Sequence, residues 1–194
     1  MNKTILILIL LFASAQVFSQ FSFGPKVGYS TSRLSTDIED IKESIKHNFQ
    51  AGAFLRFGKK LYFQPEIYYA TGGGTLEFKS SGLKETIKLQ SIGVPVLIGY
   101  KLLNVKVFNF RIFAGPAANF IVNKSTDIDG FFDEDNFKDI SWGIDIGTGL
   151  DLFILTLDFR YEFGLNNIYI PTTGEDNAKM NSNLFIISLG FKLL

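Results

Sequence analysis

Strict alternation of apolar and polar residues along most of the chain constrains the fold more than any other feature of this sequence. The clearest segment is 139–152, where large apolar residues from Ile140 to Leu152 alternate with Asp, Ser and Gly. Residues 155–165 repeat the pattern, with Asp158, Arg160 and Glu162 on the polar face. Because successive side chains of a strand point to opposite faces, each segment predicts a β-strand with one apolar and one polar face.

Six further segments alternate in the same way, which brings the predicted strands to eight: 21–34, 47–57, 61–71, 85–102, 110–123 and 183–193. The segment 85–102 changes phase near Ser91, which predicts a β-bulge. The connections are alternately short (58–60, about 103–109 and 153–154) and long and polar. This arrangement predicts an all-β fold: an eight-stranded antiparallel up-and-down barrel that spans an outer membrane, with short periplasmic turns and long extracellular loops.

Alternation alone leaves open a soluble, lipocalin-like barrel whose apolar face lines a ligand cavity. Two properties of the polar faces favour a lipid-facing apolar surface instead. The polar faces are rich in Gly, which relieves crowding in a narrow lumen, and they carry charges of both signs that can pair inside a closed barrel. These charges are Lys26, Arg56, Arg111, Arg160 and Lys192 against Glu66, Asp145, Asp151, Asp158 and Glu162. We predict that they form a structural ion-pair network that fills the lumen, so that the barrel does not conduct appreciably.

Aromatic residues on the apolar faces form two predicted rings. The lower ring contains Phe21, Phe23, Phe57, Phe63, Tyr100, Phe110 and Phe191. The upper ring contains Tyr29, Phe49, Tyr69, Phe120, Trp142, Phe163 and Phe185. Two aromatic girdles around an aliphatic band are typical of a barrel that meets two membrane interfaces, whereas a ligand cavity gives no reason for two rings.

Four prolines fall inside the strands: Pro25, Pro65, Pro95 and Pro116. Each removes a hydrogen-bond donor from the ladder, so we expect bulges or strand ends there.

The first residues have the pattern of an export signal. Lys3 gives a short positive region, and residues 5–12 form the apolar run ILILILLF, which is too short for a membrane-spanning helix. Val17 and Ser19 precede the expected cleavage site, so we predict a cleaved signal peptide at 1–19 and an outer-membrane β-barrel domain at 20–194.

Composition excludes several kinds of function. The chain has no Cys and a single His, so thiol chemistry, disulfides and multi-His metal sites within one chain are excluded. The 19 basic and 19 acidic residues cancel without a basic block, which argues against nucleic-acid binding. We expect no cofactor, no metal and no catalytic site.

Six stretches together resemble the PorT-like outer-membrane β-barrel domain of Bacteroidota, an eight-stranded barrel of the OmpA/OmpX type. They are FQPEIYYATGGG (63–74), IGVPVLIGYKL (92–102), FAGPAANFIV (113–122), WGIDIGTGLDL (142–152), LDFRYEFGLNNI (157–168) and LFIISLGFKL (184–193). The resemblance implies the fold and the outer-membrane location. The founding member is tied to protein secretion and surface maturation, but most members have no assigned activity, and a role does not transfer on fold alone.

His47, at the upper end of the second strand, is the one candidate for barrel-enzyme chemistry. Ser30, Ser32 and Ser35 could lie near it, as a lipid-modifying enzyme would need, but an exposed rim histidine is the simpler interpretation. The loop at 123–138 has the acidic residues Asp127, Asp129, Asp133, Glu134 and Asp135, in an order that is not that of an EF-hand. A solvated acidic loop is the simpler interpretation than calcium binding. Phe131, Phe132 and Phe137 in that loop suggest contact with lipid headgroups or a partner.

Two other extracellular segments have patterns of their own. Ile38, Ile41 and Ile45 have helical spacing, which predicts a short amphipathic helix over the barrel mouth. Residues 72–89 predict a hairpin that rises above the membrane.

We therefore expect a non-enzymatic, monomeric barrel that contacts outer-membrane lipid and lipopolysaccharide and binds or assists a protein partner through its extracellular loops. A narrow solute channel is the alternative, and a barrel enzyme using His47 is a more distant one.

Overall fold

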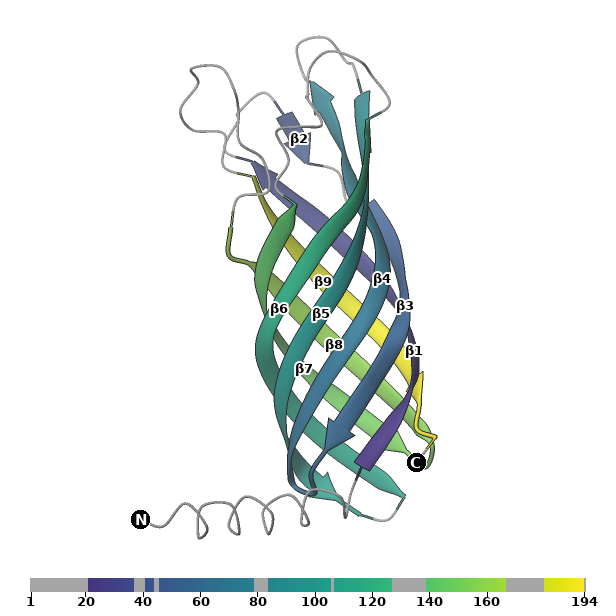
Figure 1. Cartoon of the computed structure of the whole chain (residues 1–194). Helices are drawn as coiled ribbons and strands as arrows, with labels where there is room; N and C mark the ends of the chain where they lie inside the picture. The colour runs from purple at the N-terminus through teal and green to yellow at the C-terminus, as the bar shows by residue number, and fades with distance from the viewer. Residues whose placement is uncertain are drawn as a thin grey trace, which may run out of the picture.

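The computed structural model describes residues 21–36, 41–43, 46–78, 84–105, 107–126, 139–166 and 180–193. Nearly all of these residues lie in strands (Figure 1). The strands are β1 (Phe21–Thr36), β2 (Ile41–Glu43), β3 (Lys46–Phe57), β4 (Leu61–Phe78), β5 (Lys84–Asn104), β6 (Phe108–Thr126), β7 (Ile140–Leu152), β8 (Leu155–Gly164) and β9 (Met180–Phe191). Across the ranges that the structure describes, no helix has the length and apolar character needed to span a bilayer.

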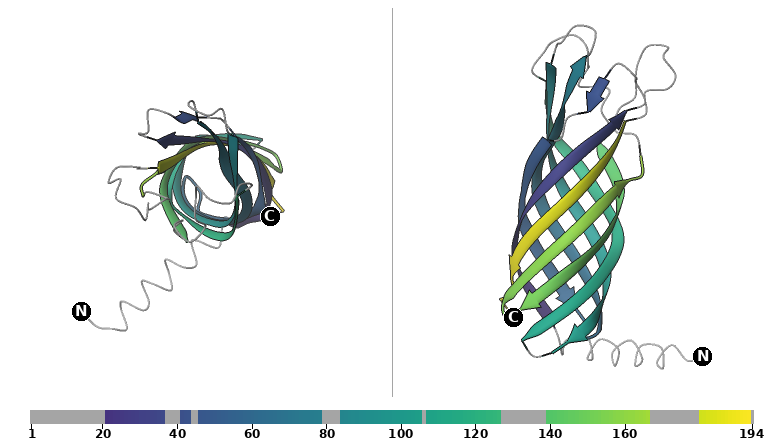
Figure 2. Two further views of the ribbon diagram at one scale, coloured as in Figure 1. Left: turned by 90° about the horizontal axis from the view of Figure 1, so that it is seen from above. Right: turned by 180° about the vertical axis from the view of Figure 1, so that it is seen from behind.

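Eight strands close into a barrel, which confirms the predicted architecture (Figures 1 and 2). Around the ring, β1 pairs with β3, then β4, β5, β6, β7, β8 and β9 follow, and β9 returns to β1. Every pairing is antiparallel. One further described strand, β2, stands outside the ring and pairs with the upper end of β4.

The two ends of the barrel differ as predicted. At the lower end, β3–β4 and β7–β8 are joined by tight turns, in which Gly58 (φ 121°) and Phe153 (φ 50°) have left-handed backbone conformations. At the upper end, β4 and β5 continue their ladder beyond the ring as far as Glu77 opposite Lys84. This confirms the predicted hairpin for its described residues, and we call 72–78 and 84–89 the hairpin arm.

The bulge predicted near Ser91 is confirmed, because the β5–β6 register shifts between Gln90 and Ser91. A second shift between Lys101 and Leu103 was not predicted. The helix expected over the barrel mouth is wrong for residues 41–43, which form β2 against Leu76–Phe78 of β4. A helix of a few residues is marginal in water, whereas the edge of β4 above the end of β3 offers unpaired backbone groups.

The prolines cause no register shift, so the expected bulges are wrong. The alternative expectation of an end holds at Pro25, because the ladder from β1 to β9 stops at Lys26. Each proline lies where the ladder to the preceding strand of the ring is interrupted. The interruptions are at Pro25 toward β9, Pro65 toward β3, Pro95 toward β4 and Pro116 toward β5. In the three internal cases the same register resumes beyond the gap, for example from Phe54–Glu66 to Phe57–Phe63. Hydrogen bonds on both sides therefore hold the register while the missing N–H costs the ladder a local bond.

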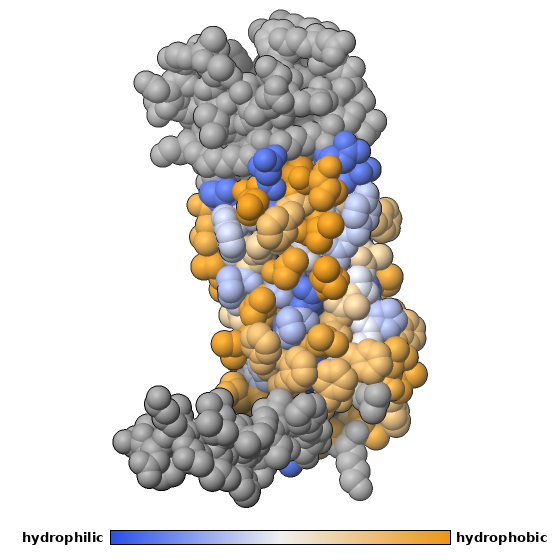
Figure 3. All heavy atoms as spheres, in the orientation of Figure 1, coloured by the Kyte–Doolittle hydropathy of each residue, from blue (hydrophilic) through white to orange (hydrophobic). Residues whose placement is uncertain are grey.

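The outer wall of the barrel is apolar and aromatic (Figure 3). Alternate residues of each strand point outward, among them Ile144 and Ile146 of β7 and Tyr161 and Phe163 of β8. Members of the predicted rings meet across strands: Phe21 lies 5.2 Å from Phe57 near the lower end, and Tyr29 lies 5.5 Å from Phe49 near the upper end, between ring centroids. The outward orientation predicted for the apolar faces is confirmed.

Candidate functional site in the barrel lumen

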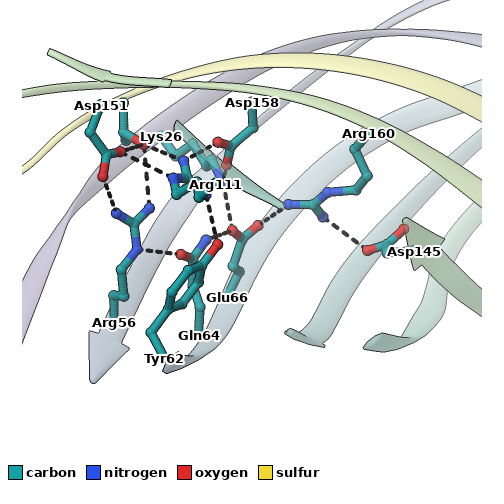
Figure 4. A network of polar contacts seen from close by, with 11 residues as sticks. Lys26, Arg56, Tyr62, Gln64, Glu66, Arg111, Asp145, Asp151, Asp158 and Arg160 are labelled. Carbon is teal, nitrogen blue, oxygen red and sulfur yellow. Dashed lines mark hydrogen bonds and ion pairs between the residues drawn. The ribbon is translucent and has the colours of Figure 1, made fainter. Parts of the chain in front are cut away.

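The lumen contains most of the polar side chains that the structure buries. Four cations and five carboxylates are buried in it: Lys26, Arg56, Arg111 and Arg160, with Glu66, Asp145, Asp151, Asp158 and Glu162. They come from six of the eight strands of the ring, and Figure 4 shows the side chains of all but Glu162 pointing toward one another. The sequence predicted all nine of these positions, and the structure brings them together.

The lower half of the network is organised by two arginines. Arg56 donates to Gln64 Oε1 at 2.5 Å and to Asp151 Oδ2 at 2.9 Å. Arg111 donates to Asp151 Oδ1 at 3.2 Å, to Thr156 Oγ1 at 2.6 Å and to Asp158. Thr156 in turn donates to Asp151 at 2.7 Å. The two guanidinium groups and two carboxylates are thereby linked across β3, β6, β7 and β8.

The upper half continues the chain of ion pairs. Lys26 Nζ lies 2.5 Å from both Glu66 and Asp158. Arg160 bridges Glu66 at 2.6 Å and Asp145 at 3.1 Å (Figure 4). Each of these cations serves two carboxylates, so removal of one charge leaves others without compensation. Buried charges are tolerated only when they are paired in this way.

Inward-facing aromatic rings support the cations, and the sequence patterns did not identify them as lumen residues. The Arg56 guanidinium lies 5.1 Å from the Tyr62 ring centroid, and Arg111 lies 5.5 Å from that of Phe113. Tyr62, Leu97 and Phe113 form an apolar cluster beside the ion pairs. Lumen glycines make room for these side chains: a Cβ at Gly99 would lie 2.1 Å from the Tyr62 ring, and one at Gly147 would lie 2.6 Å from the Phe113 ring. The lumen is filled by its own side chains.

Two carboxyl groups at the upper end of the network have fewer partners than the rest. Asp145 and Glu162 are directly opposite each other on β7 and β8. Arg160 reaches Asp145 but also serves Glu66, and Glu162 accepts a hydrogen bond from Asn119 at 2.7 Å. Among the described residues, no donor reaches Asp145 Oδ1. Glu162 was predicted to join the ion-pair network, but it lies opposite a like charge, Asp145.

This difference gives a matched pair of substitutions. We expect Glu66→Gln to lower the free energy of unfolding by about 2–3 kcal/mol, because it weakens charged hydrogen bonds to both Lys26 and Arg160. Glu162→Gln removes the same charge but retains an acceptor for Asn119 and relieves repulsion with Asp145, so we expect little change. Urea unfolding in detergent micelles measures both. Equal losses in the two variants would contradict the assigned partners.

Most of the enzyme site that was considered around His47 lies outside the described side chains. Its backbone pairs with Thr31 at the upper part of β3, but its side chain lies outside the described residues. Ser30 is buried, while the side chains of Ser32 and Ser35 also lie outside the description. The acidic residues Asp127 to Asp135 and the three phenylalanines of that loop are not described either. Within the described part of the chain, no group of three or more His, Asp or Glu residues is arranged to hold a metal ion.

Comparison with known proteins agrees with this geometry. A family model described as "Outer membrane protein beta-barrel domain" matches residues 13–169. No curated protein sequence matches the chain. Among solved structures, OprG from Pseudomonas aeruginosa is 11% identical with a TM-score of 0.53, and covers 89% of this chain and 95% of its own. Neisserial surface protein A (NspA) is 15% identical with a TM-score of 0.52, over 90% and 99%. At these identities the two structures show a shared fold.

Proposed function

Because the chain belongs to the family of outer membrane protein β-barrel domains, we propose that it is a non-enzymatic surface protein whose extracellular segments bind a partner. Its barrel lies in the bacterial outer membrane. The filled lumen is the observation that carries the proposal. Arg111 and Arg160 cross the lumen and are 0% and 1% exposed. The described residues therefore leave no open path for a solute through the barrel. Binding of a protein partner is then left to the chain outside the bilayer.

The hairpin arm is the described segment best placed for that role. Its two strands pair from Gly72–Leu89 to Glu77–Lys84, above the ring of the barrel (Figure 2). β2 adds a strand to one side of the arm, and the end of β6 adds another, with Thr126 opposite Ile87. The result is a small sheet that stands outside the membrane on a rigid base. Such a sheet offers backbone hydrogen-bonding groups to a partner above the lipid surface.

The resemblance to PorT-like barrels supports a proposal about the kind of protein that binds the extracellular segments. We infer that the partner is a component of a surface-protein assembly or secretion complex, because the founding member of that group is tied to protein secretion and surface maturation. The placement of the chain among PorT-like proteins of Bacteroidota is part of the same proposal. So is removal of residues 1–19 on export, for which amino-terminal sequencing of the protein from outer membranes should begin at Gln20.

Shortening the hairpin arm tests the proposal. We expect replacement of residues 75–86 by an Asn-Gly turn to leave the barrel intact, because Gly74 and Ile87 are paired and can close a two-residue hairpin. Photocrosslinking in intact cells, from a reactive residue placed at Gly72, should give a partner adduct in the full-length chain and none in the shortened one.

The matched control places the reactive residue at Lys60, in the turn at the opposite end of the barrel. It should give no adduct with a surface partner in either chain. Equal adducts from the full-length and shortened chains would contradict binding through the arm. Heat-modifiable gel migration confirms that each variant has folded.

A further inference from the structure

The lipid-facing wall of the barrel has a groove of about 530 Å³ on the side formed by β1, β3, β4, β8 and β9. The floor of the groove lies below the surrounding aromatic rings because Val27 of β1 is paired with the small Ala51 of β3. Three aromatic side chains, Tyr29, Phe49 and Tyr69, stand around this floor. Tyr29 and Phe49 are packed edge to face at 5.5 Å, which gives one rim of the groove a fixed shape.

The chemistry of the floor favours hydrocarbon as the occupant. Val27, Ala51 and Ile187 offer only apolar surface. The hydroxyl of Thr71, at the edge, is already engaged: it accepts a hydrogen bond from the Phe49 amide at 3.2 Å and donates one to the Phe49 carbonyl at 3.3 Å. Gln50 also belongs to the lining, but its side chain is buried toward the lumen. The other polar groups of the lining are the hydroxyls of Tyr29 and Tyr69 at its rim, so the floor itself offers a ligand only apolar surface.

The position of the groove identifies the source of that hydrocarbon. Tyr29, Phe49 and Tyr69 belong to the predicted upper aromatic girdle, on the side of the hairpin arm, so the upper part of the groove lies in the outer half of the bilayer. Leu157 and Leu189 extend the groove toward the lower ends of β8 and β9. In an outer membrane the outer leaflet consists of lipopolysaccharide. The groove is continuous with the rest of the lipid-facing wall. We propose that it binds one acyl chain of a lipopolysaccharide molecule and holds it longer than the surrounding lipid.

A second copy of the chain fits the groove less well. A stable interface buries about 800 Å² on each partner and involves about 20–30 residues a side. Only eleven residues line the groove, and its rim of bulky rings keeps a flat barrel wall away from the floor at Ala51. A thin, flexible chain reaches the floor without moving these rings. The proposal rests on the outer-membrane location and not on the partner binding proposed above.

Retention of lipid by the purified protein tests the proposal. The probe is deep-rough lipopolysaccharide mixed with phosphatidylethanolamine in vesicles into which the full chain is refolded, followed by mild detergent extraction and native mass spectrometry. We expect one lipopolysaccharide per wild-type barrel. Ala51→Phe fills the groove and should reduce the retained fraction by about tenfold.

Ala114→Phe is the matched control. Ala114 is lipid-facing on β6, on the opposite side of the ring from β1, so the same substitution there should retain lipopolysaccharide at the wild-type level. If Ala51→Phe does not fold, Ala51→Leu fills part of the groove and should give a smaller loss. Equal retention by wild type and the folded Ala51 variant would overturn the proposal. So would equal loss in the control, retention of phosphatidylethanolamine in place of lipopolysaccharide, or a dimer that Ala51→Phe abolishes.

Discussion

Replacement of Arg111 by leucine is expected to lower the free energy of unfolding by about 3–5 kcal/mol, because it leaves buried carboxylates without their cation. Arg111 is 0% exposed and contacts Asp151, Asp158 and Thr156. Asp158 would retain Lys26 and Asp151 would retain Arg56, but each of those cations already serves another group. Urea unfolding in micelles, followed by tryptophan fluorescence, measures the loss.

The double variant Arg111→Leu, Asp158→Leu is the control for this prediction. It removes the cation together with a carboxylate that it contacts, so it should be more stable than Arg111→Leu alone. A buried ion pair replaced as a unit often costs little, whereas half of one is costly. If the double variant loses as much as the sum of the two single variants, the two groups do not interact in the way that the structure shows.

A charge on the lipid-facing wall is expected to be nearly as damaging. Ile146 is 51% exposed on the outer wall, near the middle of β7 between Ala114 and Tyr161. Ile146→Arg places a cation in the hydrocarbon and should cost about 2–4 kcal/mol, because an arginine at the bilayer midplane loses its hydration. Refolding yield into vesicles and urea unfolding measure this cost.

The adjacent residue is the natural control. Asp145 points into the lumen, and Asp145→Asn retains an oxygen that can accept from Arg160, so it should leave assembly intact. Ile146→Met, which keeps the apolar character of the outer face, should also assemble normally. Equal assembly of Ile146→Arg and Asp145→Asn would show that the inward and outward faces of β7 are wrongly assigned.

Period-two alternation was enough to predict the fold because it reports directly on the environment of each strand face. In β7, Asp145 and Ile146 are neighbours in sequence but lie on opposite sides of the wall, and each was correctly placed. Tyr62 and Phe113 were not assigned to a face from the sequence, although alternation with the outward Phe63 and Phe110 places both inward. Glycines on neighbouring strands, Gly99 and Gly147, make room for these rings in the lumen.

The pairing of the charges could not be predicted in the same way. Arg56 and Asp151 are 95 residues apart and meet only because the stagger of eight strands brings β3 and β7 to the same height in the lumen. The same stagger places Glu162 opposite Asp145, although the sequence led us to expect it in the ion-pair network. The prolines illustrate a third limit. Their effect depends on which neighbouring strand would have accepted the hydrogen bond that proline cannot donate, and the closed ring determines which strand that is.

Ion conductance of the purified, refolded protein in a planar lipid bilayer tests most directly whether the lumen is closed and the function lies outside it. The account predicts no stable single-channel steps from protein whose heat-modifiable migration shows that it has folded, because Arg56, Arg111 and Arg160 are held across the lumen by their carboxylate partners. The Glu162→Gln variant should be equally silent. Stable steps in the wild type, with an ion selectivity that changes in Glu162→Gln, would place the conducting path through the lumen and contradict the account.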